Sequence, residues 1–151
     1  MSIRSAIVEY ARSLIGTPFH DAARVPGVGV DCAGVLVLAA RHCCPFVRPD
    51  FDLPPYLSTP DGHTMMEWCN RYMGSPVAKH EMQPGDALVV RTLQYPQHLG
   101  VIGGHPRGGL SLIHASNTVN PPRVVETQLV WLPNQRFIAA YCFPGVELWS
   151  K

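Results

Sequence analysis

The stretch GVDCAGVLVLAARHCC, residues 29–44, decides the fold, because a polar Asp-Cys pair stands directly before a long apolar run. Asp31 is a residue type that caps helices, and Pro45 cannot continue one, so the pattern predicts a helix over 32–44. Apolar side chains cover nearly every face of that helix, which is typical of a helix at the centre of a core. We therefore expect Cys32 to open a central, buried helix.

The composition limits the classes of protein that the chain can belong to. Its 151 residues are enough for one core, and we expect residues 1–151 to form a single domain. A formal net charge of +1 gives no reason to expect nucleic acid as a partner. No stretch approaches the roughly 20 apolar residues of a membrane span, and residues 1–16 lack a signal-peptide run. We expect synthesis in the cytoplasm without a signal peptide, and no membrane insertion.

The cysteines and histidines show no metal or disulfide pattern. The five cysteines are an odd number, and Cys43 and Cys44 are adjacent, which argues against a disulfide framework. Neither a CxxC pair nor an HExxH motif occurs, so no structural zinc site is expected. Free thiols in a reducing compartment are the expectation.

Helical periodicity comes first along the chain, and strand-like runs follow. Apolar residues recur at helical spacing over 3–14, and a third helix is predicted at about 61–73, with Asp61 at its cap. RVPGVGV, over 24–30, is expected to be a glycine-rich loop, and 45–60, with five prolines, an extended crossover. Five runs then follow at hairpin-like spacing: QPGDALVVRT, HLGVIGG, LSLIHAS, RVVETQL and RFIAAYCF. This order predicts an α+β fold, with N-terminal helices packed on one face of a C-terminal antiparallel sheet.

A thiol in the first turn of a helix has a chemistry of its own. Cys32 is expected near unpaired backbone N–H groups and the positive end of the helix dipole, both of which favour thiolate. Gly34 in the same turn costs about 1 kcal/mol of helix propensity relative to alanine, so we expect something to approach the backbone there. A nucleophilic thiolate also needs an imidazole base, and that base needs a third group to orient it.

Two histidines lie where they could supply these groups. His98 begins one strand-like run and His114 lies in the next, and adjacent antiparallel strands can place two such side chains on one face. Cys32, His98 and His114 are therefore a candidate Cys–His–His site. The residues alone leave the alternative open, because a lone buried cysteine is usually an inert small hydrophobe.

Four blocks of the sequence, in order, resemble the motifs of the NlpC/P60 cysteine peptidases: ARSLIGTPF…GVGVDCAGVL, MQPGDALVV, QHLGVIGG and SLIHAS. The closing RFIAAYCFPG resembles the phage-tail branch of that family, and the resemblance covers about residues 5–145. It implies a papain-like fold with Cys32 as nucleophile, His98 as general base and acid, and His114 as the orienting residue, without metal or cofactor. The implied reaction is hydrolysis of an amide in the peptidoglycan stem peptide, between D-γ-glutamate and a diamino acid such as meso-diaminopimelate.

The resemblance also implies a substrate site, with two departures from the family pattern. Phe19 stands where many members have tyrosine, and Ala33 where many have serine; those hydroxyls lie near substrate in members that bind a free peptide amine. Asp31 remains as a partner for a cationic group. Expected partners are the stem peptide and other phage tail proteins, and the expected place of action is the cell wall, from a virion tail.

Two other classes of protein compete with this interpretation. One is a non-enzymatic tail-tip assembly protein that uses the same fold. The other is a different acyl-transfer enzyme, such as an amidase that cuts the sugar–peptide bond or a transglutaminase-like enzyme.

Overall fold

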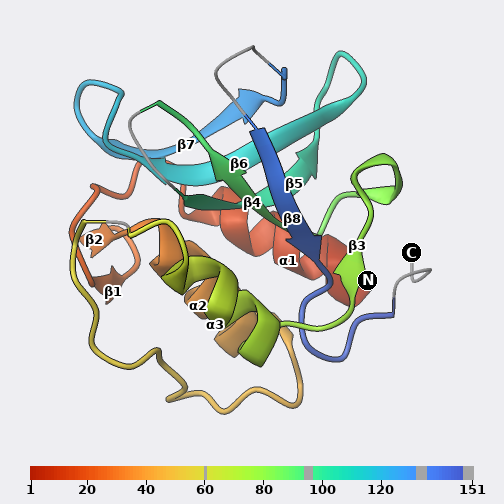
Figure 1. The fold of residues 1–151 in the computed structure, drawn as a ribbon, viewed down its shortest axis with the longest axis horizontal. Coiled ribbons are helices and arrows are strands. Elements are labelled where there is room, and N and C mark those ends of the chain that lie inside the picture. The colour runs from red at the N-terminus through yellow and green to blue at the C-terminus, as the bar shows by residue number, and fades with distance from the viewer. Residues whose placement is uncertain (60, 94–96, 132–135, 148–151) are drawn as a thin grey trace.

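The helices lie in the N-terminal half of the chain, as predicted. The structure is a computed structural model that describes residues 1–59, 61–93, 97–131 and 136–147. Within these residues the α-helices are α1 (Ile3–Ser13), α2 (Cys32–Cys43) and α3 (Thr64–Tyr72) (Figure 1). None of them combines the length and the apolar character needed to cross a membrane.

A six-stranded sheet follows the helices. Its strand order is β3-β8-β4-β5-β6-β7, and every neighbouring pair is antiparallel. The predicted α+β class is therefore confirmed. The strands are β3 (Pro76–Val77), β4 (Ala87–Arg91), β5 (His98–Gly104), β6 (Leu110–Ser116), β7 (Arg123–Gln128) and β8 (Arg136–Tyr141), with a 3₁₀ turn over Lys79–Glu81.

The local chemistry of each helix start explains where it begins. The Asp31 side chain accepts the backbone N–H of Gly34 at 2.8 Å, so α2 starts at Cys32 as predicted. The third helix starts at Thr64, later than the predicted 61. The cap position is His63 instead of Asp61, and the Asp61 carboxylate, two residues earlier, accepts the backbone N–H of Thr64 at 2.8 Å.

The predicted loop over 24–30 is a small hairpin instead. Strands β1 (Arg24–Val25) and β2 (Gly29–Val30) pair antiparallel, and Gly27 between them has φ +77°. Glycine takes this left-handed conformation at little cost, which lets so short a turn close. The crossover has neither helix nor strand over 45–59, but it is not extended throughout, because turns occur at 45–46 and 49–50.

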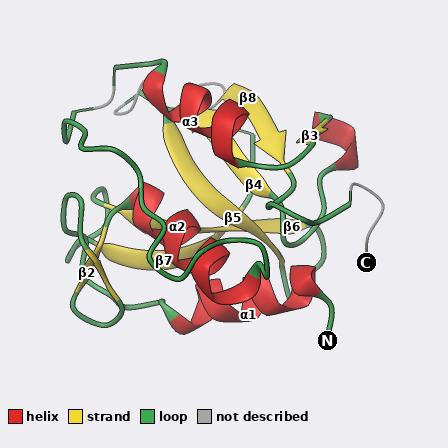
Figure 2. Ribbon diagram, turned by 90° about the horizontal axis from the view of Figure 1, so that it is seen from below, coloured by secondary structure: helices red, strands yellow, loops and turns green. Residues whose placement is uncertain are grey.

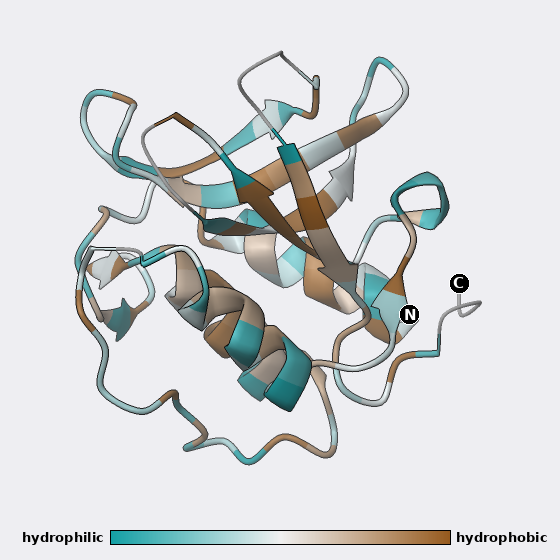
Figure 3. Cartoon of the chain, in the orientation of Figure 1, coloured by the Kyte–Doolittle hydropathy of each residue, from teal (hydrophilic) through white to brown (hydrophobic). Residues whose placement is uncertain are grey.

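The core lies between α2 and the sheet. Both α1 and α2 contact β5, α2 also contacts β6, and α2 lies between α1 and α3 (Figure 2). The α2 residues from Cys32 to Ala40 are all buried, which confirms the expected central helix. In Figure 3 the strands β4 and β8 are mostly apolar, whereas hydrophilic residues are prominent on α3. This packing sets the start of α2 against the start of β5.

Candidate active site

A cleft with a volume of about 280 Å³ opens where α2 begins. Five of the six predicted site residues line it: Phe19, Asp31, Cys32, Ala33 and His98. The crossover supplies one wall with residues 55–59, and the start of α3 supplies another. The fold thus brings together residues that lie far apart along the chain.

The sixth predicted residue, His114, does not line the cleft and lies behind His98. His98 Nε2 is 2.8 Å from His114 Nδ1, and the two rings meet edge to face with centroids 5.0 Å apart. Neighbouring strands β5 and β6 carry the two residues, as the sequence predicted. On the far side, His114 Nε2 lies 3.3 Å from the hydroxyl oxygen of Thr127 on β7. Three strands thus hold a chain of polar groups that ends at the cleft.

Cys32 is buried at the start of α2, with 8% of its surface exposed. Burial raises the pKa of its thiol to about 12, and the neighbouring charge of Asp31 adds to the rise. Hydrogen bonds from the backbone at Leu99 and Ala33 act in the opposite direction. The expectation that the helix start favours thiolate is therefore wrong in its net direction, because desolvation outweighs the helix N–H groups.

The two histidines are also shifted toward their neutral forms. Burial, helped by His114, lowers the pKa of His98 to about 3, and burial lowers the pKa of His114 to about 4. A buried imidazolium loses its hydration, so the uncharged ring is favoured. At neutral pH the site therefore contains a thiol and two uncharged imidazoles.

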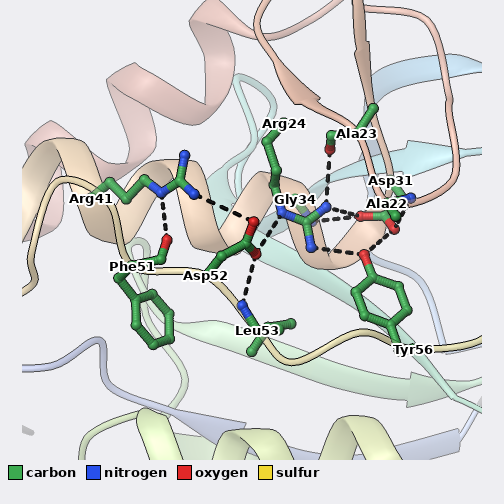
Figure 4. A network of polar contacts seen from close by, with 10 residues as sticks. All are labelled: Ala22, Ala23, Arg24, Asp31, Gly34, Arg41, Phe51, Asp52, Leu53 and Tyr56. Atoms are coloured by element: carbon green, nitrogen blue, oxygen red, sulfur yellow. Dashed lines mark hydrogen bonds and ion pairs between the residues drawn. The ribbon is translucent and has the colours of Figure 1, made fainter.

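The carboxylate of Asp31 is fully engaged by donors from the protein itself (Figure 4). Its Oδ1 accepts from the backbone N–H of Gly34 at 2.8 Å and from Arg24 Nη1 at 2.9 Å. Its Oδ2 accepts from the backbone N–H of Ala22 at 2.8 Å and from the hydroxyl of Tyr56. A carboxylate offers about four acceptor positions, and all four are used here.

Ala23 and Arg24 are the residues that approach the backbone at Gly34. A Cβ built on Gly34 would lie 2.9 Å from the carbonyl oxygen of Ala23 and 3.1 Å from Arg24 Nη1. The glycine in the first turn of α2 thus makes room for the Arg24–Asp31 ion pair, whose side chains are both largely buried.

Arg24 also binds the crossover, residues 45–59, which forms one side of the cleft. Arg24 Nε lies 3.1 Å from Asp52 Oδ1, and Arg24 Nη2 donates to the Tyr56 hydroxyl at 2.7 Å. Asp52 also pairs with Arg41 of α2, at 3.4 Å. These contacts, drawn in Figure 4, hold the crossover against the helix that carries Cys32.

Three residues of the site escaped the sequence analysis: Arg24, Tyr56 and Gln97. Arg24 lies in the short hairpin and Tyr56 in the proline-rich crossover, where no periodicity marks a residue. Gln97 lines the cleft directly before His98, and this adjacency was the available signal. Within the described residues, no group of three or more His, Cys, Asp and Glu side chains is placed to hold a metal ion.

In comparisons with known proteins, no family model matches the chain, and no curated protein matches it.

Proposed function

We propose that the chain is a cysteine peptidase with the papain-like fold of the NlpC/P60 family, acting on the peptidoglycan stem peptide as part of a phage tail. The observation that carries this proposal is one cleft lined by Cys32 and His98, with His114 hydrogen-bonded behind His98. Nucleophile, base and orienting group are the parts that acyl transfer by a thiol requires. The order of the four sequence blocks supports the choice of family and substrate.

In the proposed first step the cysteine and the histidine act together. Because Nε2 of His98 is engaged by His114, proton transfer with Cys32 falls to Nδ1. Cys32 Sγ attacks the γ-carbonyl carbon of D-glutamate as its proton passes to Nδ1. The backbone N–H of Cys32, one of the first N–H groups of α2, donates to the oxyanion. The C–N bond then breaks, and His98 returns the proton to the leaving amine.

The second step releases the acyl group. Water attacks the thioester carbon while His98 Nδ1 takes a proton from it, and the C–S bond breaks. His98 then returns this proton to the Cys32 sulfur, which restores the thiol and the uncharged imidazole. Neutral resting groups suit this cycle, because the base must be unprotonated at the start of both steps.

The three residues predicted from the sequence to contact substrate, Phe19, Asp31 and Ala33, all line the cleft. Phe19 and Ala33 give it apolar surface without the two hydroxyls found in many family members. Asp31 lies beside them, with its acceptor positions filled by Gly34, Arg24 and other groups of the chain. We therefore assign Asp31 to holding the start of α2 and the crossover in place around the substrate.

Digestion of purified diaminopimelate-type peptidoglycan tests the proposal, with products identified by mass spectrometry. Wild type is expected to release peptides that end at D-glutamate, and Cys32→Ala is expected to release none. Cys43→Ala is the matched control, because Cys43 is a free thiol at the other end of α2 and does not line the cleft. It should match wild type.

Each rival predicts a different product pattern. A sugar–peptide amidase would release stem peptides with the D-glutamyl–diaminopimelate bond intact. A tail-tip assembly protein without activity would leave the wall unchanged with all three chains. Either result would contradict the proposed peptidase.

Removing the orienting histidine is expected to slow hydrolysis. His114→Ala takes away the contact at His98 Nε2, and we expect kcat to fall about 10²-fold or more, as when a positioned base loses its orientation. His114→Asn can place an oxygen near the position of Nδ1 and should stay within about tenfold of wild type. Steady-state kinetics on a soluble stem peptide measures both. Equal losses in the two variants would contradict the orienting role.

A further inference from the structure

Three buried polar residues line the cleft, and one of them has no part in the reaction as written above. Asp31, Gln97 and His98 are each less than 9% exposed, and Gln97 is 3% exposed. Asp31 is saturated by its four donors, and His98 is the proposed base. Burying an amide is costly unless it makes hydrogen bonds, so the position of Gln97 needs a reason.

One end of the Gln97 amide is fixed by the backbone. Its Oε1 accepts the N–H of Met66 in the first turn of α3, at 3.2 Å. Because oxygen and nitrogen point apart in a planar amide, this contact directs Nε2 away from Met66. Among the described residues, none accepts a hydrogen bond from Nε2. Nε2 is also not among the fully buried polar atoms without a partner, so solvent or a ligand can reach it. An uncharged N–H donor, held through its oxygen, therefore remains on a residue that lines the cleft with Cys32 and His98 and also borders a second hollow beside α3 and β8.

We propose that Gln97 is a catalytic residue whose side-chain amide donates a hydrogen bond to the oxyanion formed when Cys32 attacks the substrate. The inference rests on the proposed function and adds a second donor to the backbone N–H of Cys32. An oxyanion is stabilised best by donors that are already oriented before charge develops, since they need no rearrangement during the reaction. The hold of Met66 on Oε1 supplies that orientation.

Three exposed donors in the cleft fit this role less well. The side chains of Ser58, Thr59 and Asn117 also line it, but all three residues are exposed to solvent. Water competes for an exposed donor and weakens its hydrogen bonds to a developing charge. Gln97 is the uncharged amide in the cleft that is both buried and held.

Two substitutions at Gln97 distinguish loss of the N–H donor from a change in the size of the side chain. Gln97→Glu keeps the acceptor for the Met66 N–H and replaces the NH₂ group by oxygen. Gln97→Met keeps a similar length without charge or donor. Both should lower kcat on a soluble stem tetrapeptide about 10²- to 10³-fold, the usual loss for one oxyanion donor, with KM within about threefold. Gln128→Glu is the control, the same change at an exposed glutamine at the end of β7 that does not line the cleft, and should change kcat less than about threefold.

The rate of thiol modification shows whether a Gln97 substitution has disturbed the structure around Cys32. Methyl methanethiosulfonate modifies a thiol without any carbonyl oxyanion, so its rate with Cys32 in Gln97→Met should stay within about twofold of wild type. Full hydrolysis by both Gln97 variants would overturn the inference, as would a fall in kcat matched by an equal fall in thiol modification. A wild type that hydrolyses no peptide would overturn the proposed function and this inference with it.

Discussion

Replacing Arg4 by methionine is expected to lower the free energy of unfolding by about 3–5 kcal/mol, the usual cost of leaving one member of a buried ion pair alone. The Arg4 and Asp86 side chains are 4% and 0% exposed, and Arg4 Nη1 lies 2.6 Å from Asp86 Oδ1. Arg4 also donates to the carbonyl oxygen of Glu147 at 3.1 Å, so it joins α1 to the C-terminal segment. Without the arginine, Asp86 would lose its counter-ion in a site closed to water.

A double variant separates the ion pair from the loss of packing. Arg4→Met with Asp86→Asn leaves no buried charge, and asparagine can still accept the Gln83 N–H that Asp86 accepts at 2.9 Å. We expect the double variant to recover at least about half of the loss, because neutral replacements of buried ion pairs cost little. Urea unfolding of wild type, Arg4→Met and the double variant measures this. A double variant no more stable than Arg4→Met would contradict the account.

The destabilisation by Arg4→Met should also depend on pH. Burial raises the pKa of Asp86, and Arg4 opposes that rise. Removing Arg4 therefore raises the pKa of the folded state further above that of the unfolded state. Protonation then favours the folded form, so the loss of stability should be smaller near pH 4 than at pH 7.

Alkylation of Cys32 by iodoacetamide is expected to accelerate about tenfold per pH unit between pH 7 and pH 10, without a plateau. Only the thiolate reacts, and burial with the charge of Asp31 raises the pKa of Cys32 to about 12. The thiolate fraction therefore grows in proportion to hydroxide over this range, a span of about 10³. Peptide mapping by mass spectrometry follows Cys32 separately from the other thiols.

A charged resting state would give a different dependence of the alkylation rate on pH. A resting thiolate–imidazolium pair would be alkylated at a rate nearly independent of pH between about 5 and 8. A plateau in that range would contradict neutral resting groups. Because the pKa of His98 is lowered to about 3, this base stays unprotonated well below pH 6. Hydrolysis should therefore not be lost through protonation of His98 in that range.

The central helix and the two histidines could be predicted because their signals are local. Asp31 before an apolar run is a capping pattern, and two consecutive strand-like runs at hairpin-like spacing could bring His98 and His114 onto one face of the sheet. The structure places both features as the sequence indicated. The start of α3 was placed too early, because the cap position is His63, and Asp61 accepts the Thr64 N–H from two residues before it.

What escaped prediction depends on tertiary packing. Arg24, Asp31 and Tyr56 meet across 32 positions of the chain, from segments without periodicity. Likewise, the helix dipole is a local property of the sequence near Cys32, whereas burial is a property of the folded chain. Burial decides the pKa of the thiol, so a prediction from the helix start alone had the wrong sign.

Hydrolysis of a soluble stem tetrapeptide in ¹⁸O-labelled water tests most directly the claim that Cys32 carries acyl transfer. Wild type and Cys43→Ala are expected to release the fragment ending at D-glutamate with one ¹⁸O in its new carboxylate, and Cys32→Ala is expected to release none. Release of the labelled fragment by Cys32→Ala at the wild-type rate would contradict the claim, as would an intact peptide after incubation with folded wild type.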